Sequence, residues 1–463
     1  MLFSGIPFLF YFLPCVLLVY FIVPQKGRNA VLLAASLFFY GWGEPKFLLF
    51  MVFSIVQGYV FARLIGRGRR KKLFLTLSLV LSFALLGYCK YADFFIKNFN
   101  AVTGLSLPLL KIALPIGISF YTFQIASYEI DVYRGDVAAQ HNFIDFAAYV
   151  AMFPQLIAGP IVRYRDIAPQ LKERTHSLEA AASGASRFAV GLGKKVLVAN
   201  VLAQLVSAYK ASAEQTALYA WLYAIAFTLQ IYFDFSGYSD MAIGLGRIFG
   251  FTFPENFRYP YIAKSITEFW RRWHMSLGTW FRDYLYIPLG GSRCSRIRHI
   301  FNILVVWMAT GFWHGAAWNF VFWGLFYAVL LMAEKFFLLP ALKKGRVLPH
   351  VYVLLAVTLG FVLFDAASLK DALHQLGTLF GAGTASGLGT EALYMLRSYG
   401  VVLALAVLGA TPLPAMLWKK VQEAKSLAPV LTVAEPLCTF ALLALCTAFL
   451  VDGSFNPFLY FRF

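Results

Sequence analysis

Apolar runs of about twenty residues follow one another along almost the whole chain, and only short loops separate them. A helix of ~20 apolar residues spans the hydrocarbon layer of a bilayer, so each run is a candidate membrane span. The composition agrees, because 60% of the 463 residues are hydrophobic and only 13% are charged. The sequence therefore predicts an all-α polytopic membrane protein and excludes a string of soluble domains.

The apolar segments give an expected set of spans, in which 30–42 is a short re-entrant or tilted half-span. The expected segments are 6–24, 30–42 with 46–65, 73–92, 113–130, 186–208, 217–235, 300–319, 320–339, 349–366, 397–416 and 430–451. Residues 131–185 and 236–299 are too polar for simple spans. We see no internal repeat of the kind that builds a transporter from two inverted halves.

Basic loops predict the orientation of the chain, because Lys and Arg are enriched on the cytoplasmic side. The basic loops that we expect there contain Lys26 and Arg28, Arg67 to Lys72, Lys343 to Arg346, and Lys419 to Lys425. This arrangement places both termini outside the cytoplasm. The same loops, facing anionic lipid headgroups, account for the net charge of +18, so no nucleic-acid partner is expected.

Several kinds of site have no signature in the sequence. The five cysteines contain no CxxC pair, which argues against a disulfide framework or a structural zinc site. HExxH, Walker and GxSxG motifs are absent, which argues against a zinc protease, an ATPase and a serine hydrolase. We expect no metal site.

Residues 232–298 contain the densest group of polar and charged motifs in the sequence. Asp234 lies in the string YFDFSGYSD at 232–240, and further on Ser265 and Glu268 fit a capping box at a helix start. Beyond this cap, helical spacing predicts one aromatic stripe, formed by Trp270, Trp273, Leu277, Trp280 and Tyr284. A different face carries Arg271, His274, Gly278 and Arg282. An interfacial amphipathic helix, aromatic toward lipid and basic toward headgroups, explains most of these residues but does not require His274.

A second histidine, His314, lies within an otherwise apolar segment, where an ionisable side chain is costly and usually faces a cavity or a partner. Gly311 and Gly315 form a GxxxG pair that favours close helix approach. A hydrogen-bonded core histidine is the alternative. The other five histidines are expected in loops or, for His374, in a polar stretch.

The C-terminal residues 455–463, FNPFLYFRF, form an unusually aromatic tail after an apolar segment. An aromatic belt at the outer interface is one explanation. The alternative is a tail that folds back into a cavity and presents the hydroxyl group of Tyr460.

Two strings carry a resemblance to a known family, FWRRWHMSLGTWFRDYLYIPLGG at 269–291 and GFWHGAAW at 311–318. PIGISFYTF at 115–123, FPQLIAGP at 153–160, the string at 232–240 and the C-terminal PFLYFRF extend it. Together they resemble the membrane-bound O-acyltransferase (MBOAT) family, in its bacterial alginate O-acetyltransferase-like branch. The resemblance covers most of the chain apart from patches near 60–110 and 340–430. Because the branch is bacterial, the resemblance implies a location in a bacterial plasma (inner) membrane.

The resemblance implies a ring of about 11 tilted transmembrane helices, with re-entrant or interfacial helices, around a central funnel. Residues 1–463 then form a single membrane domain, with a catalytic core at 113–340 and C-terminal spans and tail at 349–463. His314 matches the family's catalytic histidine and is expected to act as general base. His274 matches the second histidine of the bacterial pattern, in an orienting role. Tyr460 matches a tyrosine thought to accept the acyl group, with Leu459 where Ile is usual.

The candidate donor-binding residues begin with three arginines, Arg271, Arg272 and Arg282, which can bind the phosphates of coenzyme A, although headgroup anchoring explains them equally well. The remaining candidates for substrate or donor binding are Asp283, Trp313, Asn319 and Asp234. No bound cofactor is expected. Acetyl-CoA or another acyl thioester would be the donor substrate.

The resemblance, with which these residues are consistent, implies a membrane O-acyltransferase that moves an acetyl group from a cytoplasmic thioester across the membrane. An extracytoplasmic partner, an SGNH-type acetyltransferase, would pass it to an exported polysaccharide such as alginate, and the sequence does not choose among alginate, cellulose and peptidoglycan systems. Two alternatives stay open. One is a transporter or flippase for an acyl group or lipid, and the other is a non-catalytic scaffold for an extracytoplasmic acetyltransferase.

Overall fold

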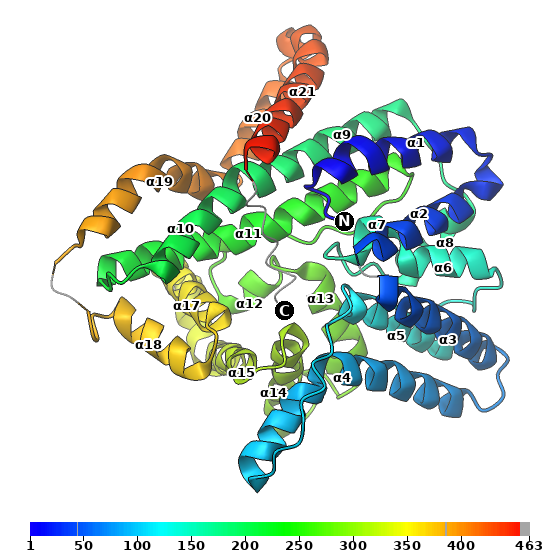
Figure 1. Ribbon diagram of the computed structural model, residues 1–463, viewed down its shortest axis with the longest axis horizontal. Coiled ribbons are helices and arrows are strands. Elements are labelled where there is room, and N and C mark those ends of the chain that lie inside the picture. The colour runs from blue at the N-terminus through cyan, green and yellow to red at the C-terminus, as the bar shows by residue number, and fades with distance from the viewer. Residues whose placement is uncertain (44, 385–386, 454–463) are drawn as a thin grey trace. The chain divides into compact units, whose positions relative to one another are not determined.

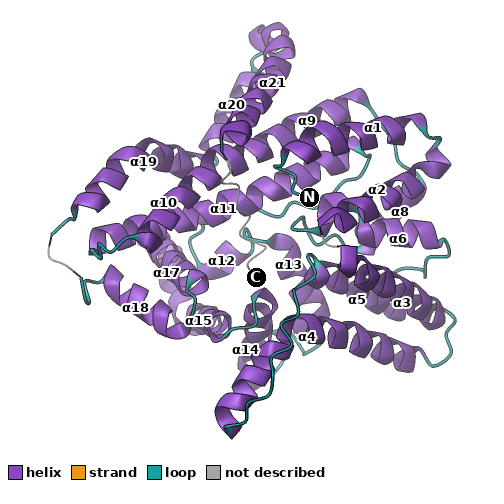
Figure 2. Ribbon diagram, viewed as in Figure 1, coloured by secondary structure: helices purple, strands orange, loops and turns teal. Residues whose placement is uncertain are grey.

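The computed structural model describes residues 1–43, 45–384 and 387–453, and every extended regular element in these ranges is a helix (Figure 2). Among the described residues, eight helical segments are long and apolar enough to cross a membrane. They are Pro45–Gly66, Lys71–Thr103, Leu178–Ala211, Ala217–Ile248, Trp318–Lys344, Leu348–Asp365, Thr390–Gly409 and Pro429–Asp452. An all-α polytopic membrane protein is thereby confirmed.

Several boundaries differ from the sequence expectation. The segment expected at 73–92 continues to Thr103, and the one expected at 113–130 begins only at Ile118. The helix expected at 300–319 ends five residues early, at His314. Four of the expected segments form helices that are too short or too polar to count among the eight membrane-span candidates. They are 6–24, 30–42, 113–130 and 300–319. The total number of spans and the ring arrangement stay predictions.

Contacts group the chain into two compact units, and the first comprises Met1–Phe188 and Met241–Pro254. In this unit α3 (Leu48–Gly66) packs against α4 (Lys71–Thr103) and α5 (Ile118–Arg134), and α2 (Arg28–Gly43) packs against α6 (Phe143–Ala151) (Figure 1). A cluster of phenylalanine rings fills part of its interior, with Phe12 5.3 Å from Phe153 and 5.5 Å from Phe39 between centroids. Its helices are α1 (Leu13–Ile22), α2 (Arg28–Gly43), α3 (Leu48–Gly66), α4 (Lys71–Thr103), α5 (Ile118–Arg134), α6 (Phe143–Ala151), α7 (Phe153–Leu156), α8 (Tyr164–Lys172) and most of α9 (Leu178–Gly193).

The second unit comprises Ala189–Asp240 and Glu255–Phe463, and it contains both histidines that the sequence singles out. α14 (Arg296–His314) packs along α15 (Trp318–Ala333), and α17 (Leu348–Asp365) contacts α15 and α18 (Leu369–Leu379). The core of this unit includes Trp323, Tyr327 and Val357. Its helices are α10 (Asn200–Ala211), α11 (Ala217–Ile248, entering the first unit), α12 (Ile266–Trp270), α13 (Met275–Phe281), α14 (Arg296–His314), α15 (Trp318–Ala333), α16 (Leu339–Lys344), α17 (Leu348–Asp365), α18 (Leu369–Leu379), α19 (Thr390–Gly409), α20 (Leu413–Glu423) and α21 (Ala428–Asp452). The division into a catalytic core at 113–340 and a C-terminal part at 349–463 stays a prediction.

Three histidines that we expected in loops or a polar stretch lie in helices instead. His299 is in α14, His350 in α17 and His374 in α18. His299 is buried, and its Nε2 lies 2.9 Å from the Tyr286 hydroxyl.

Candidate active site

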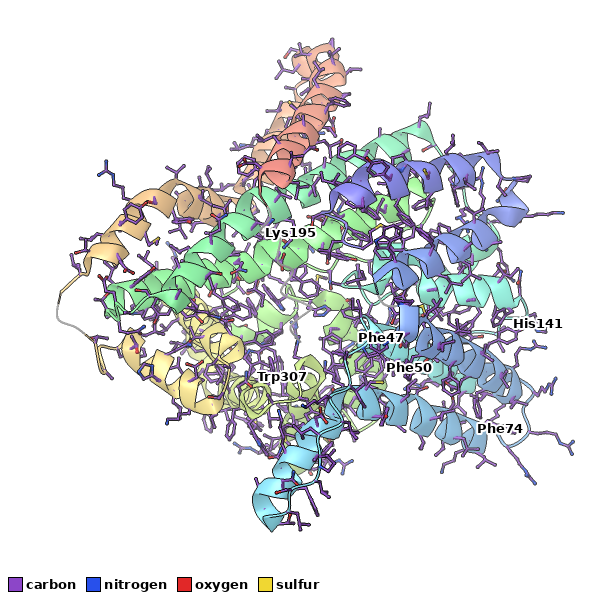
Figure 3. All side chains as sticks on the ribbon, viewed as in Figure 1. Phe47, Phe50, Phe74, His141, Lys195 and Trp307 are labelled. Carbon is purple, nitrogen blue, oxygen red and sulfur yellow. The ribbon has the colours of Figure 1, made fainter. Side chains whose placement is uncertain are left out.

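His314 is the last residue of α14, at the turn of a tight helical hairpin. A Cβ atom at Gly311 would lie 2.2 Å from the Phe320 carbonyl oxygen, and one at Gly324 would lie 2.2 Å from the carbonyl oxygen of Trp307, which Figure 3 labels. No real Cβ atom fits at such a distance, so the two backbones touch because both positions are glycine. The close approach predicted from Gly311 is therefore present, and it fixes the backbone beside His314.

The imidazole of His314 is surrounded by aromatic rings and is 8% exposed. Its ring centroid lies 5.0 Å from that of Trp313 and 5.2 Å from those of Trp323 and Phe364, in each case edge to face. Rings in this arrangement hold the imidazole plane from several sides. They also keep most water away from it.

The stretch that we expected to form one amphipathic helix is broken at its middle. α12 ends at Trp270 and α13 begins at Met275, and His274 between them has a left-handed backbone with a φ of 45°. The expected lipid-facing stripe is also wrong, because Trp273, Leu277 and Trp280 are 4–6% exposed and buried inside the protein. Trp270 packs on Trp307 and Tyr327 of the hairpin, at 4.8 Å from each.

The start of α12 is capped more fully than the capping box predicts. The Ser265 hydroxyl accepts the Glu268 N–H at 3.0 Å, as expected, but the Glu268 carboxylate accepts the Lys264 N–H instead of that of Ser265. In addition, the buried carboxylate of Glu334 accepts the backbone N–H groups of Ile266 and Thr267 and the Thr267 hydroxyl at 2.7 Å. Our sequence analysis missed Glu334, although a carboxylate inside an expected span is itself a signal.

His274 is held by a hydrogen bond from its side chain to a buried asparagine. Its Nδ1 lies 3.1 Å from Oδ1 of Asn256, which precedes α12. The His274 ring also packs edge to face on Phe235 at 4.6 Å and lies 6.0 Å from Trp313. Trp313 thus contacts both His274 and His314, and the fold brings together the two histidines that the sequence places 40 residues apart (314 minus 274).

Asn256 is the site residue that our sequence analysis did not assign. It lies in the string PENFRYP at 254–260, after the long apolar helix α11. A polar residue in a segment flanked by prolines is common in surface turns, so no local signal shows that this asparagine is 0% exposed.

The candidate donor-binding arginines differ in their partners. Arg272 forms an ion pair with Glu268 at 2.8 Å, and Arg282 forms one with the neighbouring Asp283 at 2.8 Å. Burial opposes the ionisation of Glu268, but the Lys264 N–H and Arg272 outweigh it and lower the pKa of this carboxyl. Arg271 is exposed. Two of the three arginines thus already have a carboxylate partner.

The remaining candidates occupy separate positions. Asp234 forms a buried ion pair with Lys195 at 2.5 Å (Figure 3 labels Lys195), and Asn319 donates from its side chain to the Ala366 carbonyl at 3.0 Å, at the end of α17. Tyr460 lies outside the described residues. Within the part of the chain that the structure describes, no group of three or more His, Cys, Asp or Glu side chains could hold a metal ion.

Comparison with known proteins identifies a matching family and several similar proteins. The model of the membrane-bound O-acyltransferase family matches residues 118–340, which include both histidines. The probable alginate O-acetylase AlgI of Azotobacter vinelandii is 45% identical over 88% of this chain and 84% of its own length. The protein of the same name from Pseudomonas aeruginosa is 46% identical over 83% and 76%. The peptidoglycan O-acetyltransferase of Helicobacter pylori is 35% identical over 82% and 80%.

Proposed function

Because the chain belongs to the membrane-bound O-acyltransferase family, we propose that this O-acyltransferase moves an acetyl group from a cytoplasmic thioester for O-acetylation of an exported polysaccharide such as alginate. The names of its relatives support acetyl as the group and a cell-surface polymer as the acceptor. The observation that carries the proposal is the pair of buried histidines around Trp313, inside the range that the family model matches.

The proposed chemistry uses His314 as general base. A nitrogen of its neutral imidazole takes the proton of an attacking hydroxyl while the hydroxyl oxygen forms a bond to the thioester carbon. The carbon–sulfur bond then breaks, and the imidazolium returns the proton to the leaving thiolate. General-base catalysis contributes roughly 10²–10⁴-fold, so the alignment of hydroxyl and thioester must supply much of the remaining acceleration.

We propose Tyr460 as the hydroxyl that first accepts the acetyl group. Its role rests on the family resemblance of the tail PFLYFRF at 457–463. An extracytoplasmic SGNH-type acetyltransferase would then transfer the acetyl group to the polymer. This relay requires a plasma (inner) membrane location, with the donor on the cytoplasmic side and the C-terminal tail on the other.

We propose acetyl-CoA as the donor. Among the three candidate arginines, Arg271 is the strongest candidate to bind a donor phosphate, because Arg272 and Arg282 already neutralise Glu268 and Asp283. A guanidinium group that binds phosphate bidentately is specific for that geometry, so Arg271→Lys should weaken donor binding.

The test is acetylation of the exported polysaccharide in cells that carry the wild-type protein, His314→Ala or no gene, with membrane abundance matched by blot. We expect His314→Ala to be as inactive as the strain without the gene. A variant that keeps most of its activity would favour the transporter or scaffold alternative, neither of which needs a base at position 314. Tyr460→Phe, tested in the same strain, should also abolish acetylation, and intact acetylation would exclude the relay.

A further inference from the structure

The side chain of Asn256 joins three segments of the second unit at the position where the chain breaks at His274. Its Nδ2 donates to the Ser239 hydroxyl of α11 at 3.0 Å. Its Oδ1 lies 3.1 Å from His274 Nδ1, 3.2 Å from the backbone nitrogen of Ser276 and 2.9 Å from the Ser276 hydroxyl. Its main-chain carbonyl also accepts the N–H of Met275 at 2.9 Å, so it holds both the ring and the backbone beside it.

The backbone N–H of Ser276 determines the orientation of the Asn256 side-chain amide, that is, whether Oδ1 or Nδ2 faces Ser276. A backbone N–H is only a donor, so the amide atom that faces it must be the carbonyl oxygen and not the NH₂ group. The same orientation lets the NH₂ group donate to Ser239. A hydroxyl can donate or accept, so Ser239 is compatible with this orientation, and the Ser276 N–H determines it.

This orientation also decides which nitrogen of His274 carries hydrogen. A carbonyl oxygen only accepts, so the ring nitrogen 3.1 Å away must donate. Nδ1 therefore carries hydrogen in the neutral imidazole, and it does so equally in the protonated one. Only Nε2 differs between the two states.

We propose that Asn256 is a positioning residue for the transfer reaction, which holds His274 as its Nδ1–H tautomer and makes Nε2 the nitrogen that accepts a hydrogen bond or a proton. The inference rests on the proposed function. His274 contacts Trp313, which also contacts His314, so Asn256 orients one of the two histidines of the proposed site without contacting the reacting atoms. Ser239 supports it by fixing the amide.

The first experiment reads the tautomer directly and needs no turnover. Protein labelled with ¹⁵N-histidine is reconstituted in lipid, and the spectrum of His274→Ala is subtracted from that of the wild type to isolate the His274 resonances. We expect a protonated Nδ1 and an unprotonated Nε2 for the neutral ring, and loss of this fixed pattern in Asn256→Leu. The opposite tautomer, or an unchanged pattern in Asn256→Leu, would overturn the proposal. Since this result does not depend on catalysis, it stands apart from the fate of the proposed function.

The second experiment measures acetyl transfer from labelled acetyl-CoA in membrane vesicles at several pH values. Asn256→Leu removes the acceptor, and we expect kcat to fall by ~10²-fold or more, since a wrong tautomer in a comparable histidine site costs up to about 10⁴. Asn256→Asp keeps an acceptor at Nδ1, so most activity should remain. The negative charge of the introduced carboxylate would stabilise the imidazolium form of His274, in which Nε2 no longer accepts a hydrogen bond or a proton. The acidic limb of the pH–rate profile should therefore move to higher pH by about one unit or more in Asn256→Asp.

A double variant separates positioning from general damage to the fold. If Asn256 acts through His274, Asn256→Leu should cause little further loss in a His274→Ala background, whereas independent effects would multiply. Asn302→Leu is the matched control, because Asn302 is also 0% exposed but donates to the Gly291 carbonyl. It should lower abundance and leave the pH–rate profile unchanged. Multiplicative losses in the double variant, or a wild-type profile in Asn256→Asp, would contradict the proposal.

Discussion

The two histidines of the proposed site are positioned by different means. His314 lies at the end of a hairpin in which the backbones of α14 and α15 touch through Gly311 and Gly324. His274 lies between two short helices, in a left-handed conformation that the Asn256 side chain supports. Helix packing thus fixes the position of His314, whereas a side chain distant in the sequence fixes that of His274. The two regions should therefore fail in different ways when they are altered.

The largest expected effect separates the chemical roles of the two residues. His314→Ala should lower acetyl transfer by roughly 10²–10⁴-fold, because it removes the proposed general base. His274→Asn should cost less, because an asparagine amide can still donate a hydrogen bond toward Asn256. The measurement is acetylated polymer per unit of membrane protein, at matched abundance. Equal losses in both variants would show that the two histidines do not divide the work in this way.

The next effect breaks the hairpin itself. Gly311→Leu places a Cβ atom 2.2 Å from the Phe320 carbonyl oxygen, so α14 and α15 must separate, at a cost of about 3 kcal/mol or more. We expect little folded protein in the membrane and a lowered melting temperature in detergent. Gly278→Ala in α13 is the control, since a Cβ atom there lies 3.8 Å from its nearest neighbour, the Trp270 carbonyl oxygen. Normal abundance of Gly311→Leu would contradict the close contact.

A smaller effect concerns the cap of the broken segment. Glu334→Leu leaves the N–H groups of Ile266 and Thr267 without their acceptor, which should lower the free energy of unfolding by about 1–3 kcal/mol. Glu423→Leu is the control, because Glu423 is exposed and its ion pair with Lys419 spans 3.6 Å. Melting temperatures of the two purified variants provide the measurement. If both variants melt like the wild type, the cap contributes nothing to stability.

The difference between the two regions also explains what the sequence could predict. The close helix approach beside His314 was partly predictable because its signals are local, namely a histidine in an apolar run and Gly311 of the GxxxG pair, although Gly324 and not Gly315 completes the backbone contact. The break at His274 was not, because aromatic spacing from Trp270 to Tyr284 predicts a continuous helix. That helix is interrupted by hydrogen bonds from Asn256, 18 residues away, while Glu334, 68 residues away, caps the short helix before it. Tyr460 was identified by resemblance alone and lies outside the described residues.

The smallest predicted effect tests the backbone difference without chemistry. At position 274, with a φ of 45°, glycine is free of the strain that an alanine meets, so His274→Gly should be about 1 kcal/mol more stable than His274→Ala. At position 314, the last helical residue of α14, the order should reverse, with His314→Gly less stable than His314→Ala by up to about 0.5–1 kcal/mol. All four variants lack an imidazole, so each pair compares only the backbone. Thermal unfolding in detergent measures the two differences, and their opposite signs are the expected result. If the sign is the same at both positions, His274 does not have the strained backbone that sets its segment apart from the hairpin.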